Sequence, residues 1–349
     1  MRTILIHCLT GDNNRMFDPH ERDGYNDPAI YLRERFQQLG YSLKTADDNP
    51  LDGCDWVFFS DAISVKPYSG WRGLARKLKA RLQGRPLARD LYGECLRAGM
   101  AQRMALFLWE APAVSPANWN PELHKSFPVI FTWHDQYVDG RKFIKIHWPQ
   151  TRQFPSVPKI TFKDRKLLVN ISMNKFSHHP RELYSTRRIS IRYFERNQPG
   201  NFDLYGIGWD RPSRFFERVF PWMQKTYPSY RGTVKNKWDV LPRYRFSLCY
   251  ENIRDEPGWV TEKIFDCMRA GCVPIYWGAA NITDYVDADA FIDRRRFKSD
   301  AELESCLLGI TEQQYERFQG AIQDYLRSER FAKFLPPAYA DTIIHALHL

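Results

Sequence analysis

The feature that most constrains the fold is a repeated alternation between short apolar runs and amphipathic stretches. The apolar runs are rich in β-branched and aromatic residues, which is typical of buried strands, and the amphipathic stretches between them are typical of crossover helices. Repeated βα units of this kind predict an α/β fold with parallel sheets. In the first part of the chain, we expect strands at 2–9, 41–46, 56–61, 104–109, 128–133 and 143–148, and helices at 28–39 and 72–83.

A proline-rich segment interrupts the alternation. Residues 149–165 contain three prolines and no periodicity, which predicts a linker. We therefore expect an N-terminal domain over 1–155, a C-terminal domain over 156–330 and a helical segment over 331–349. Open α/β domains bind ligands where the carboxyl ends of their strands converge, so two such domains facing each other predict a ligand cleft between them. Beyond the linker, we expect strands at 167–172, 202–206, 245–250, 272–277 and 290–293, helices at 182–196, 213–223, 235–243 and 261–270, and mostly helix after 299.

Composition predicts an ordered, soluble protein of a reducing compartment. The chain is 43% hydrophobic and 26% charged, which excludes disordered and fibrous classes. No apolar stretch approaches the ~18 residues of a membrane span, and the N-terminus lacks the features of a secretory leader. The seven cysteines are scattered and lie mostly in apolar stretches, unlike a disulfide framework. We expect a cytoplasmic protein.

Charge is unevenly distributed along the chain. The net charge is +10, but residues 1–60 hold ten acids against six bases, and residues 141–200 hold fourteen bases against three acids. The middle of the chain therefore predicts an anionic partner, which charge alone leaves open between nucleic acid, an acidic membrane and a nucleotide diphosphate. The helix near 72–81 places leucines on one face among basic residues. It is either a solvated surface helix or a peripheral contact with the inner face of an anionic membrane.

The densest group of chemistry-bearing residues lies in 246–278. An apolar strand is followed by a polar loop and by a helix that starts near Thr261. Helix N-termini bind anions, and Lys263 in the first turn adds a full positive charge. Glu262 can accept hydrogen bonds from the hydroxyls of a sugar or ribose. The alternative interpretation is an ordinary helix capped by Thr261.

This segment resembles a known family. FSLCYEN, VTEKIFD, CVPIYWG and AFIDRRRF are similar to the C-terminal signature of the α-1,3/4-fucosyltransferases, glycosyltransferase family 10, and especially to its bacterial branch. The similarity runs from about Tyr230 to Phe297 and continues more weakly upstream to roughly residue 104. It implies a GT-B fold of two Rossmann-like domains, with the acceptor bound by the first domain and GDP-fucose by the second. It also implies an inverting transfer of fucose to a glycan hydroxyl, without a metal or other cofactor.

The resemblance implies a set of donor-binding residues. Glu262 and Lys263 match the Glu-Lys pair that contacts the GDP-sugar, and Asn252 and, more loosely, Trp259 match donor positions ahead of it. A diphosphate-binding arginine is expected in LYSTRRISIRYFE, where the spacing favours Arg187 over Arg188. A guanidinium suits a diphosphate in this basic region. The alternative is that both arginines lie on a solvated helix face.

Glu110 is the candidate catalytic base. Inverting transfer needs a group that removes the proton of the acceptor hydroxyl as the new bond forms. Glu110 follows the apolar run MALFLW and precedes Ala111-Pro112, and LWEAP resembles the family's strand-end glutamate. Desolvation there would raise the pKa of Glu110, which would make it a stronger base. The alternative is a solvated glutamate at a strand end.

Two other functions and one metal motif compete with this hypothesis. The same fold could use another GDP-deoxyhexose, or a lipid-linked acceptor in surface polysaccharide or lipopolysaccharide synthesis. A nucleic-acid-binding protein would explain the positive charge, but it leaves the acidic first sixty residues and the VTEK segment without a role, so no nucleic-acid partner is expected. Asp287-Ala288-Asp289 resembles a metal-binding D-x-D, but it follows the donor signature, and we interpret it as a solvated loop.

Overall fold

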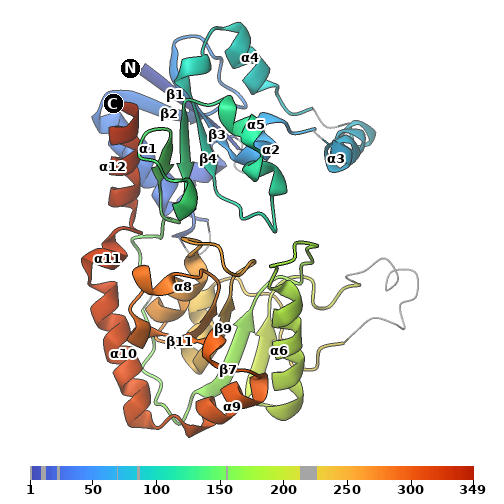
Figure 1. Ribbon diagram of the computed structural model, residues 1–349, viewed down its shortest axis with the longest axis vertical. Helices are drawn as coiled ribbons and strands as arrows, with labels where there is room; N and C mark the ends of the chain where they lie inside the picture. Colours follow the sequence, from blue (N-terminus) through green and yellow to red (C-terminus); the bar gives the residue numbers. More distant parts are fainter. Residues whose placement is uncertain are drawn as a thin grey trace. The chain divides into compact units, whose positions relative to one another are not determined.

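The chain folds into two compact units (Figure 1). The computed structural model describes residues 2–8, 13–21, 24–68, 70–84, 87–154, 156–212 and 226–349. Unit 1 comprises Met1–Arg152 and Leu335–Leu349, and unit 2 comprises Gln153–Phe334. The division falls inside the expected linker, and the chain returns to unit 1 at Leu335.

Unit 1 is built on a six-stranded parallel sheet in the order β2-β1-β3-β4-β5-β6. Every strand predicted in this part of the chain is confirmed, with small shifts at the ends. The strands are β1 (Arg2–His7), β2 (Tyr41–Thr45), β3 (Cys54–Ser60), β4 (Met104–Leu108), β5 (Val129–Thr132) and β6 (Phe143–Lys145). The helices are α1 (Asp27–Gln38), α2 (Asp61–Val65), α3 (Gly70–Leu82), α4 (Leu91–Arg97), α5 (Pro121–Lys125) and α12 (Pro336–Leu347).

Both faces of this sheet are buried, which explains the continuous apolar runs of its strands. Alternate residues of each strand face opposite cores, so that Phe58 and Phe107 pack on one side and Phe59 and Leu106 on the other. α1 and α12 lie side by side on the first face (Figure 1). The C-terminal helix therefore belongs to the core of the first unit.

Unit 2 contains a five-stranded parallel sheet in the order β11-β10-β9-β7-β8. Its strands are β7 (Lys166–Ile171), β8 (Phe202–Tyr205), β9 (Tyr244–Tyr250), β10 (Val273–Trp277) and β11 (Ile292–Asp293). Its helices are α6 (Tyr184–Asn197), α8 (Glu262–Arg269), α9 (Asp300–Gly309), α10 (Glu312–Leu326) and α11 (Glu329–Ala332). The strands and the helices at 182–196 and 261–270 agree with the predictions, and the helix predicted at 213–223 lies outside the described residues.

The helix predicted at 235–243 is wrong. This segment forms two short 3-10 turns, Lys237–Asp239 and Leu241–Arg243. The side chain of Asn236 accepts a hydrogen bond from the Trp238 N–H, which closes a local turn instead of a helix. Pro242 lacks a donor and disfavours the helical conformation in the residue before it.

The strand order of unit 2 reverses between β7 and β9. β8 lies on one side of β7, whereas β9, β10 and β11 continue on the other side. Ligands of open α/β sheets bind outside the carboxyl ends of the strands at such a reversal. The residues that follow Ile171 and Tyr250 are therefore the first place to search for a site.

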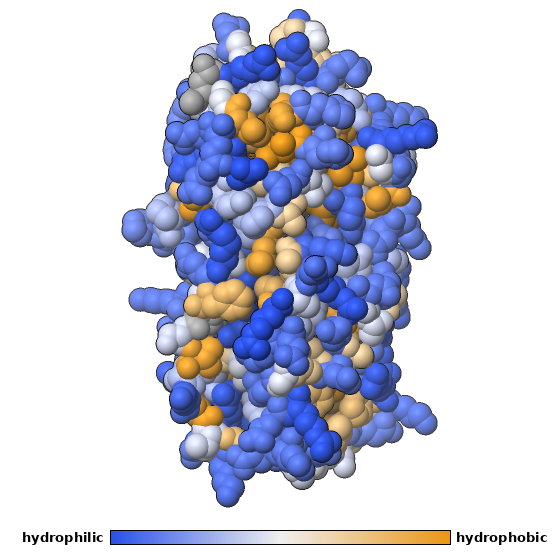
Figure 2. All heavy atoms as spheres, turned by 90° about the vertical axis from the view of Figure 1, so that its left-hand side faces the viewer, coloured by the Kyte–Doolittle hydropathy of each residue, from blue (hydrophilic) through white to orange (hydrophobic). Residues whose placement is uncertain are grey.

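Figure 2 shows one face of the molecule, which is largely hydrophilic, with scattered apolar side chains. Within the described ranges, no helix has the length and apolar character needed to cross a bilayer.

Candidate active site

The loop between β9 and α8 is tied to its neighbours on both sides. The backbone N–H of Arg254 donates to the carbonyl of Arg181 at 2.9 Å, ahead of α6. The N–H of Asp255 donates to the carbonyl of Gly278 at 2.9 Å, after β10. The N–H of Gly258 donates to the Asn281 side chain at 3.0 Å. These bonds hold the loop across the carboxyl edge of the sheet, so its side chains are presented by a fixed backbone.

A buried carboxylate, Glu251, organises the start of α8. Glu251 follows β9 directly and is fully buried. Its carboxylate accepts hydrogen bonds from the Thr261 N–H at 3.0 Å and from the Thr261 hydroxyl at 2.8 Å. Its other oxygen lies 3.0 Å from Lys263 Nζ. Burial raises the pKa of Glu251, and the Lys263 ammonium opposes that effect.

The N-terminus of α8 lacks a side-chain cap. Thr261 occupies the N-cap position, as the capped-helix interpretation required, but its hydroxyl donates to Glu251 and makes no capping bond. The first N–H groups of α8 are therefore not capped by this side chain. Together with the helix dipole, such groups favour an anion.

Lys263 and Glu262 form an ion pair beside this helix end. Their charged atoms lie 3.6 Å apart, and the two side chains are 24% and 35% exposed. Burial disfavours the Lys263 charge, but Glu251 and Glu262 outweigh it and raise the pKa of Lys263 to about 12. Burial likewise disfavours the Glu262 charge, but Lys263 and Lys237 lower the pKa of Glu262 to about 2. Both groups are charged across the physiological pH range.

Arg187 lies in the first turns of α6 and points to the carboxyl end of β9. It is 3% exposed, and its Nη2 donates to the carbonyls of Tyr250 at 2.5 Å and Glu251 at 2.9 Å. Within the described residues, its Nε has no hydrogen-bond partner and no carboxylate forms an ion pair with it. Burial lowers the pKa of Arg187. The Glu251 carboxylate acts on this guanidinium only electrostatically. A buried guanidinium that binds carbonyls and forms no ion pair is suited to an anionic ligand.

Arg188 lies differently. Its guanidinium donates to the carbonyl of Lys175 at 2.7 Å and to the Ser185 hydroxyl at 3.1 Å, and it stacks on the Phe176 ring at 3.9 Å. These bonds are on the exposed side of α6. Of the two arginines, only Arg187 reaches the candidate site.

Asn252 and Trp259 occupy contrasting positions. Asn252 follows Glu251 and is half-buried, and its carbonyl accepts a hydrogen bond from the Leu183 N–H at 3.0 Å. Trp259 is 1% exposed, and its carbonyl accepts a hydrogen bond from the Tyr276 hydroxyl at 3.0 Å. Trp259 is thus an interior residue that supports the loop, whereas Asn252 lies at its surface.

In unit 1, Glu110 lies just beyond β4, at the carboxyl edge of the sheet, and is half-buried. Its main chain is held on both sides. The Glu110 N–H donates to Asp61 Oδ1 at 3.2 Å, and the Glu110 carbonyl accepts from Asn118 Nδ2 and Trp119 Nε1, each at 3.2 Å. The position of Glu110 is the one expected of a strand-end residue.

Two buried carboxylates were not predicted as members of the sites. Glu251 binds Lys263 and Thr261, and Asp61 binds the main chain of Glu110. Both follow a strand directly, and Glu110 lies two residues beyond one. The criterion that selected Glu110 would therefore have selected them as well, but their partners are ten or more positions away in the sequence and could not be inferred from it.

Neither the D-x-D segment nor the basic cavity of unit 2 belongs to the candidate site. Asp287 pairs with Arg330 of α11, and the described residues hold no group of three or more side chains suited to a metal ion.

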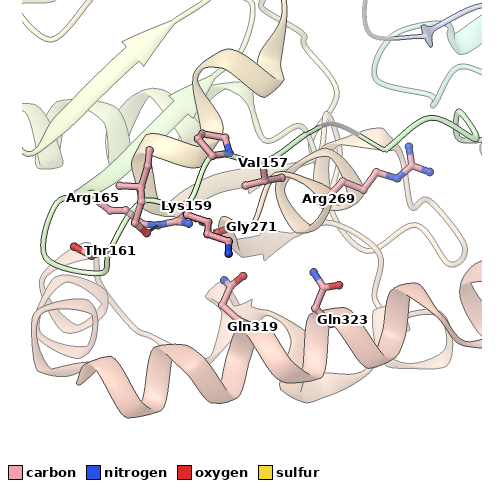
Figure 3. A pocket seen from close by; sticks show the side chains of 10 residues that line it. Val157, Lys159, Thr161, Arg165, Arg269, Gly271, Gln319 and Gln323 are labelled. Atoms are coloured by element: carbon pink, nitrogen blue, oxygen red, sulfur yellow. Dashed lines mark hydrogen bonds between the residues drawn. The ribbon is translucent and has the colours of Figure 1, made fainter.

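A cavity of about 410 Å³ lies near Arg165 and Gly271, which precede β7 and β10, and near Gln319 and Gln323 of α10 (Figure 3). It is therefore at the amino edge of the sheet, opposite Glu251.

Part of the chain is similar to known proteins. Residues 220–329 match the model of the family described as glycosyltransferase family 10 (fucosyltransferase), C-terminal. The α-(1,3)-fucosyltransferase FucT of Helicobacter pylori is 39% identical over 66 residues, which are 19% of this chain and 14% of that protein. Human α-(1,3)-fucosyltransferase 7 is 38% identical over 95 residues, which are 26% of this chain and 27% of that protein. The alignments thus span only a small part of these relatives.

Solved structures extend the similarity of fold to the whole chain. A crystal structure of an α1,3-fucosyltransferase with GDP matches with a TM-score of 0.55 at 15% identity, covering 100% of this chain and 90% of that one. A DNA-modifying β-glucosyltransferase matches with a TM-score of 0.57 at 11% identity, covering 100% of both chains. The expected GT-B fold is confirmed, and so is the resemblance of the C-terminal part to its family.

Proposed function

Because residues 220–329 of this chain belong to glycosyltransferase family 10, we propose that the protein is a fucosyltransferase that uses GDP-fucose. The product is an α-1,3 or α-1,4 linkage to a glycan hydroxyl, formed with inversion at the sugar. The observation that carries the proposal is the buried Arg187 guanidinium, which binds main-chain carbonyls at the carboxyl end of β9 and forms no ion pair with a carboxylate among the described residues. Fold neighbours include α1,3-fucosyltransferases solved with GDP and with GDP-fucose, which supports this choice of donor.

The donor is bound by unit 2 in this proposal. Arg187, Lys263 and the first N–H groups of α8 bind the diphosphate, because all three carry positive charge at one end of the sheet. Glu262 remains ionised and accepts hydrogen bonds from hydroxyls of the donor. Asn252 contacts the donor from the loop surface, and Trp259 supports that loop from the core.

Transfer uses Glu110 as the general base. The acceptor oxygen attacks the anomeric carbon, the bond from that carbon to the GDP oxygen breaks, and the hydroxyl proton moves to the Glu110 carboxylate. Negative charge grows on the departing diphosphate. Arg187 and Lys263 stabilise that charge electrostatically, so the scheme requires no metal ion or other cofactor.

The test is a measurement of nucleotide release with a panel of sugar nucleotides. GDP-fucose should be turned over in the presence of a glycan acceptor, and UDP-sugars should not. Faster turnover of a different GDP-deoxyhexose would favour the alternative donor. No turnover of any GDP-sugar with a broad set of glycan acceptors would contradict the proposal.

The acceptor side of the proposal includes a contact of α3 with anionic lipid at the cytoplasmic face of a membrane. Leu74, Leu78 and Leu82 lie on one face of α3 and are 66%, 58% and 79% exposed. The helix contains several basic residues and no acidic residue. An exposed apolar stripe among cations suits an interfacial helix, and a lipid-linked glycan of surface polysaccharide or lipopolysaccharide synthesis would be the acceptor.

A further inference from the structure

The main chain around Glu110 is held by an unusual number of side-chain hydrogen bonds. Asp61 Oδ1 accepts from the N–H groups of Trp109 at 2.8 Å and Glu110 at 3.2 Å. The Trp109 carbonyl accepts from Trp133 Nε1 at 2.9 Å, and the Glu110 carbonyl accepts from Asn118 and Trp119. Both peptide groups that flank the Cα atom of Glu110 are therefore fixed by side chains from other segments.

Asp61 and Asn118 form the centre of this arrangement. Asn118 is fully buried, and its Nδ2 donates to Asp61 Oδ1 at 2.5 Å as well as to the Glu110 carbonyl. Its Oδ1 accepts from the Ala62 N–H at 2.8 Å and from the Ser115 hydroxyl at 3.1 Å. The amide is saturated with partners, so it links the ends of β3 and β4 in one orientation.

Both the backbone and the side chain of Asp61 are in energetically unfavourable states. Its backbone has a φ of 61°, in the left-handed region that non-glycine residues seldom adopt. Its side chain is 9% exposed, and no cation forms an ion pair with it among the described residues. Burial raises its pKa, although the three hydrogen bonds oppose that rise. Backbone strain and buried ionisable groups without an ion-pair partner concentrate at functional sites.

We propose that Asp61, together with Asn118, is a positioning residue for catalysis: it fixes the main chain from which the Glu110 carboxylate extends toward the acceptor hydroxyl. The inference rests on the proposed role of Glu110 as base. A base must lie within hydrogen-bond reach of the proton that it removes, and a displacement of about 1 Å reduces rates on the order of 10²-fold. The strain at Asp61 is a consequence of placing its carboxylate under two consecutive N–H groups.

The test compares two substitutions of Asp61. Asp61→Asn keeps an oxygen that can accept the same hydrogen bonds and tolerates a left-handed backbone, so it should retain kcat to within about 3-fold. Asp61→Gly removes the side chain and also tolerates the backbone, and kcat should fall about 10- to 100-fold. GDP affinity, measured by calorimetry, should stay unchanged in both variants, because the donor residues belong to unit 2.

A double variant distinguishes positioning from a general effect on folding. In a Glu110→Gln background, Asp61→Gly should reduce kcat by less than about 2-fold further, because a residue that acts through Glu110 has nothing left to position. If Asp61→Gly reduces kcat in the Glu110→Gln background as much as it does in the unsubstituted protein, the inference is overturned. So would full activity of Asp61→Gly, or equal losses in Asp61→Asn and Asp61→Gly.

Asp27 provides the matched control. It is a buried carboxylate of the same unit, 8% exposed, which accepts hydrogen bonds from Arg152. Asp27→Asn should lower the melting temperature without changing kcat of the folded protein. If Glu110→Gln alone leaves transfer intact, the proposed base is wrong. If Glu110→Gln is inactive while Asp61→Gly is fully active, the base stands and only the positioning role fails.

Discussion

At the scale of single residues, Lys263 has two separable tasks. It neutralises Glu251, which is fully buried, and in the proposed function it binds the diphosphate of the donor. A buried carboxylate that loses its ion-pair partner is left with a poorly compensated charge, which is strongly destabilising. The stability effect and the binding effect of changing Lys263 therefore need different controls.

Lys263→Met should weaken GDP binding about 10-fold or more, because a charge-assisted hydrogen bond is lost. It should also lower the free energy of unfolding by on the order of 3 kcal/mol, because Glu251 remains buried without its partner. Calorimetry with GDP and urea unfolding measure the two quantities. The double variant Lys263→Met/Glu251→Gln should recover much of the stability but none of the affinity. Unaltered GDP affinity in Lys263→Met would remove Lys263 from the donor site.

Glu110→Gln tests the base directly. The amide is close in shape to the carboxylate but cannot accept the proton, so transfer should fall by ~10²-fold or more. GDP affinity should remain within experimental error of the unsubstituted protein. Nucleotide release under saturating donor and acceptor, with calorimetry on the same preparation, checks both expectations. Transfer that survives the substitution would place the base elsewhere.

At the scale of elements, α3 differs from the other helices of unit 1. α1 and α12 bury their apolar faces against the sheet, whereas three leucines of α3 are exposed, and Figure 1 shows α3 standing apart from that sheet. An amphipathic helix whose leucines are left exposed by the part of the chain that the structure describes is suited to a lipid interface, and its basic residues favour anionic lipid.

Replacing Leu74, Leu78 and Leu82 together by serine should abolish binding to vesicles that contain phosphatidylglycerol. The unsubstituted protein should sediment with these vesicles at low salt, less at high salt, and not with pure phosphatidylcholine vesicles. Ile189→Ser/Leu308→Ser is the control, since these residues of unit 2 are 65% and 59% exposed. Turnover of a water-soluble acceptor should be the same in all three proteins. Absence of vesicle binding, or self-association through the leucines, would contradict the lipid contact.

At the scale of the whole molecule, the chain crosses between units twice. It leaves unit 1 after Arg152 and returns at Leu335, and α12 then completes one core of unit 1 with Ala340, Ile343 and Leu347. The stability of the first unit therefore depends on the last residues of the chain.

Ile343→Ala should destabilise unit 1 by about 2–4 kcal/mol, because a fully buried side chain is replaced by a cavity. GDP should still bind and still protect unit 2, because the donor residues lie in Gln153–Phe334. Thermal unfolding with and without GDP would follow the two units. His345→Ala, on the exposed side of α12, is the control. Equal destabilisation by both substitutions would contradict the role of Ile343 in the core of unit 1. Loss of GDP binding in Ile343→Ala alone would contradict the assignment of the donor residues to unit 2.

The sequence by itself determined the strands, the parallel α/β class, the linker and the resemblance of the C-terminal segment to glycosyltransferase family 10. Strands buried on both faces are continuous apolar runs, and such runs can be recognised from consecutive residues of the sequence. Consecutive residues were also sufficient to predict that Glu110 lies at a strand end and that Glu262 and Lys263 lie at a helix start. Local patterns failed at 235–243, where one capping asparagine and Pro242 outweighed the helical periodicity.

Tertiary structure alone decided which residues meet. Arg187 and Arg188 are adjacent in the sequence, but only the packing of α6 against β9 turns one inward. Trp259 became a core residue, Glu251 became the partner of Lys263, and Asp61 came to bind the main chain of Glu110. Each of these contacts depends on strand order and on the path of a loop. Those are set by the packing of the whole sheet, because a residue's own neighbours in the chain do not fix which strand lies beside it.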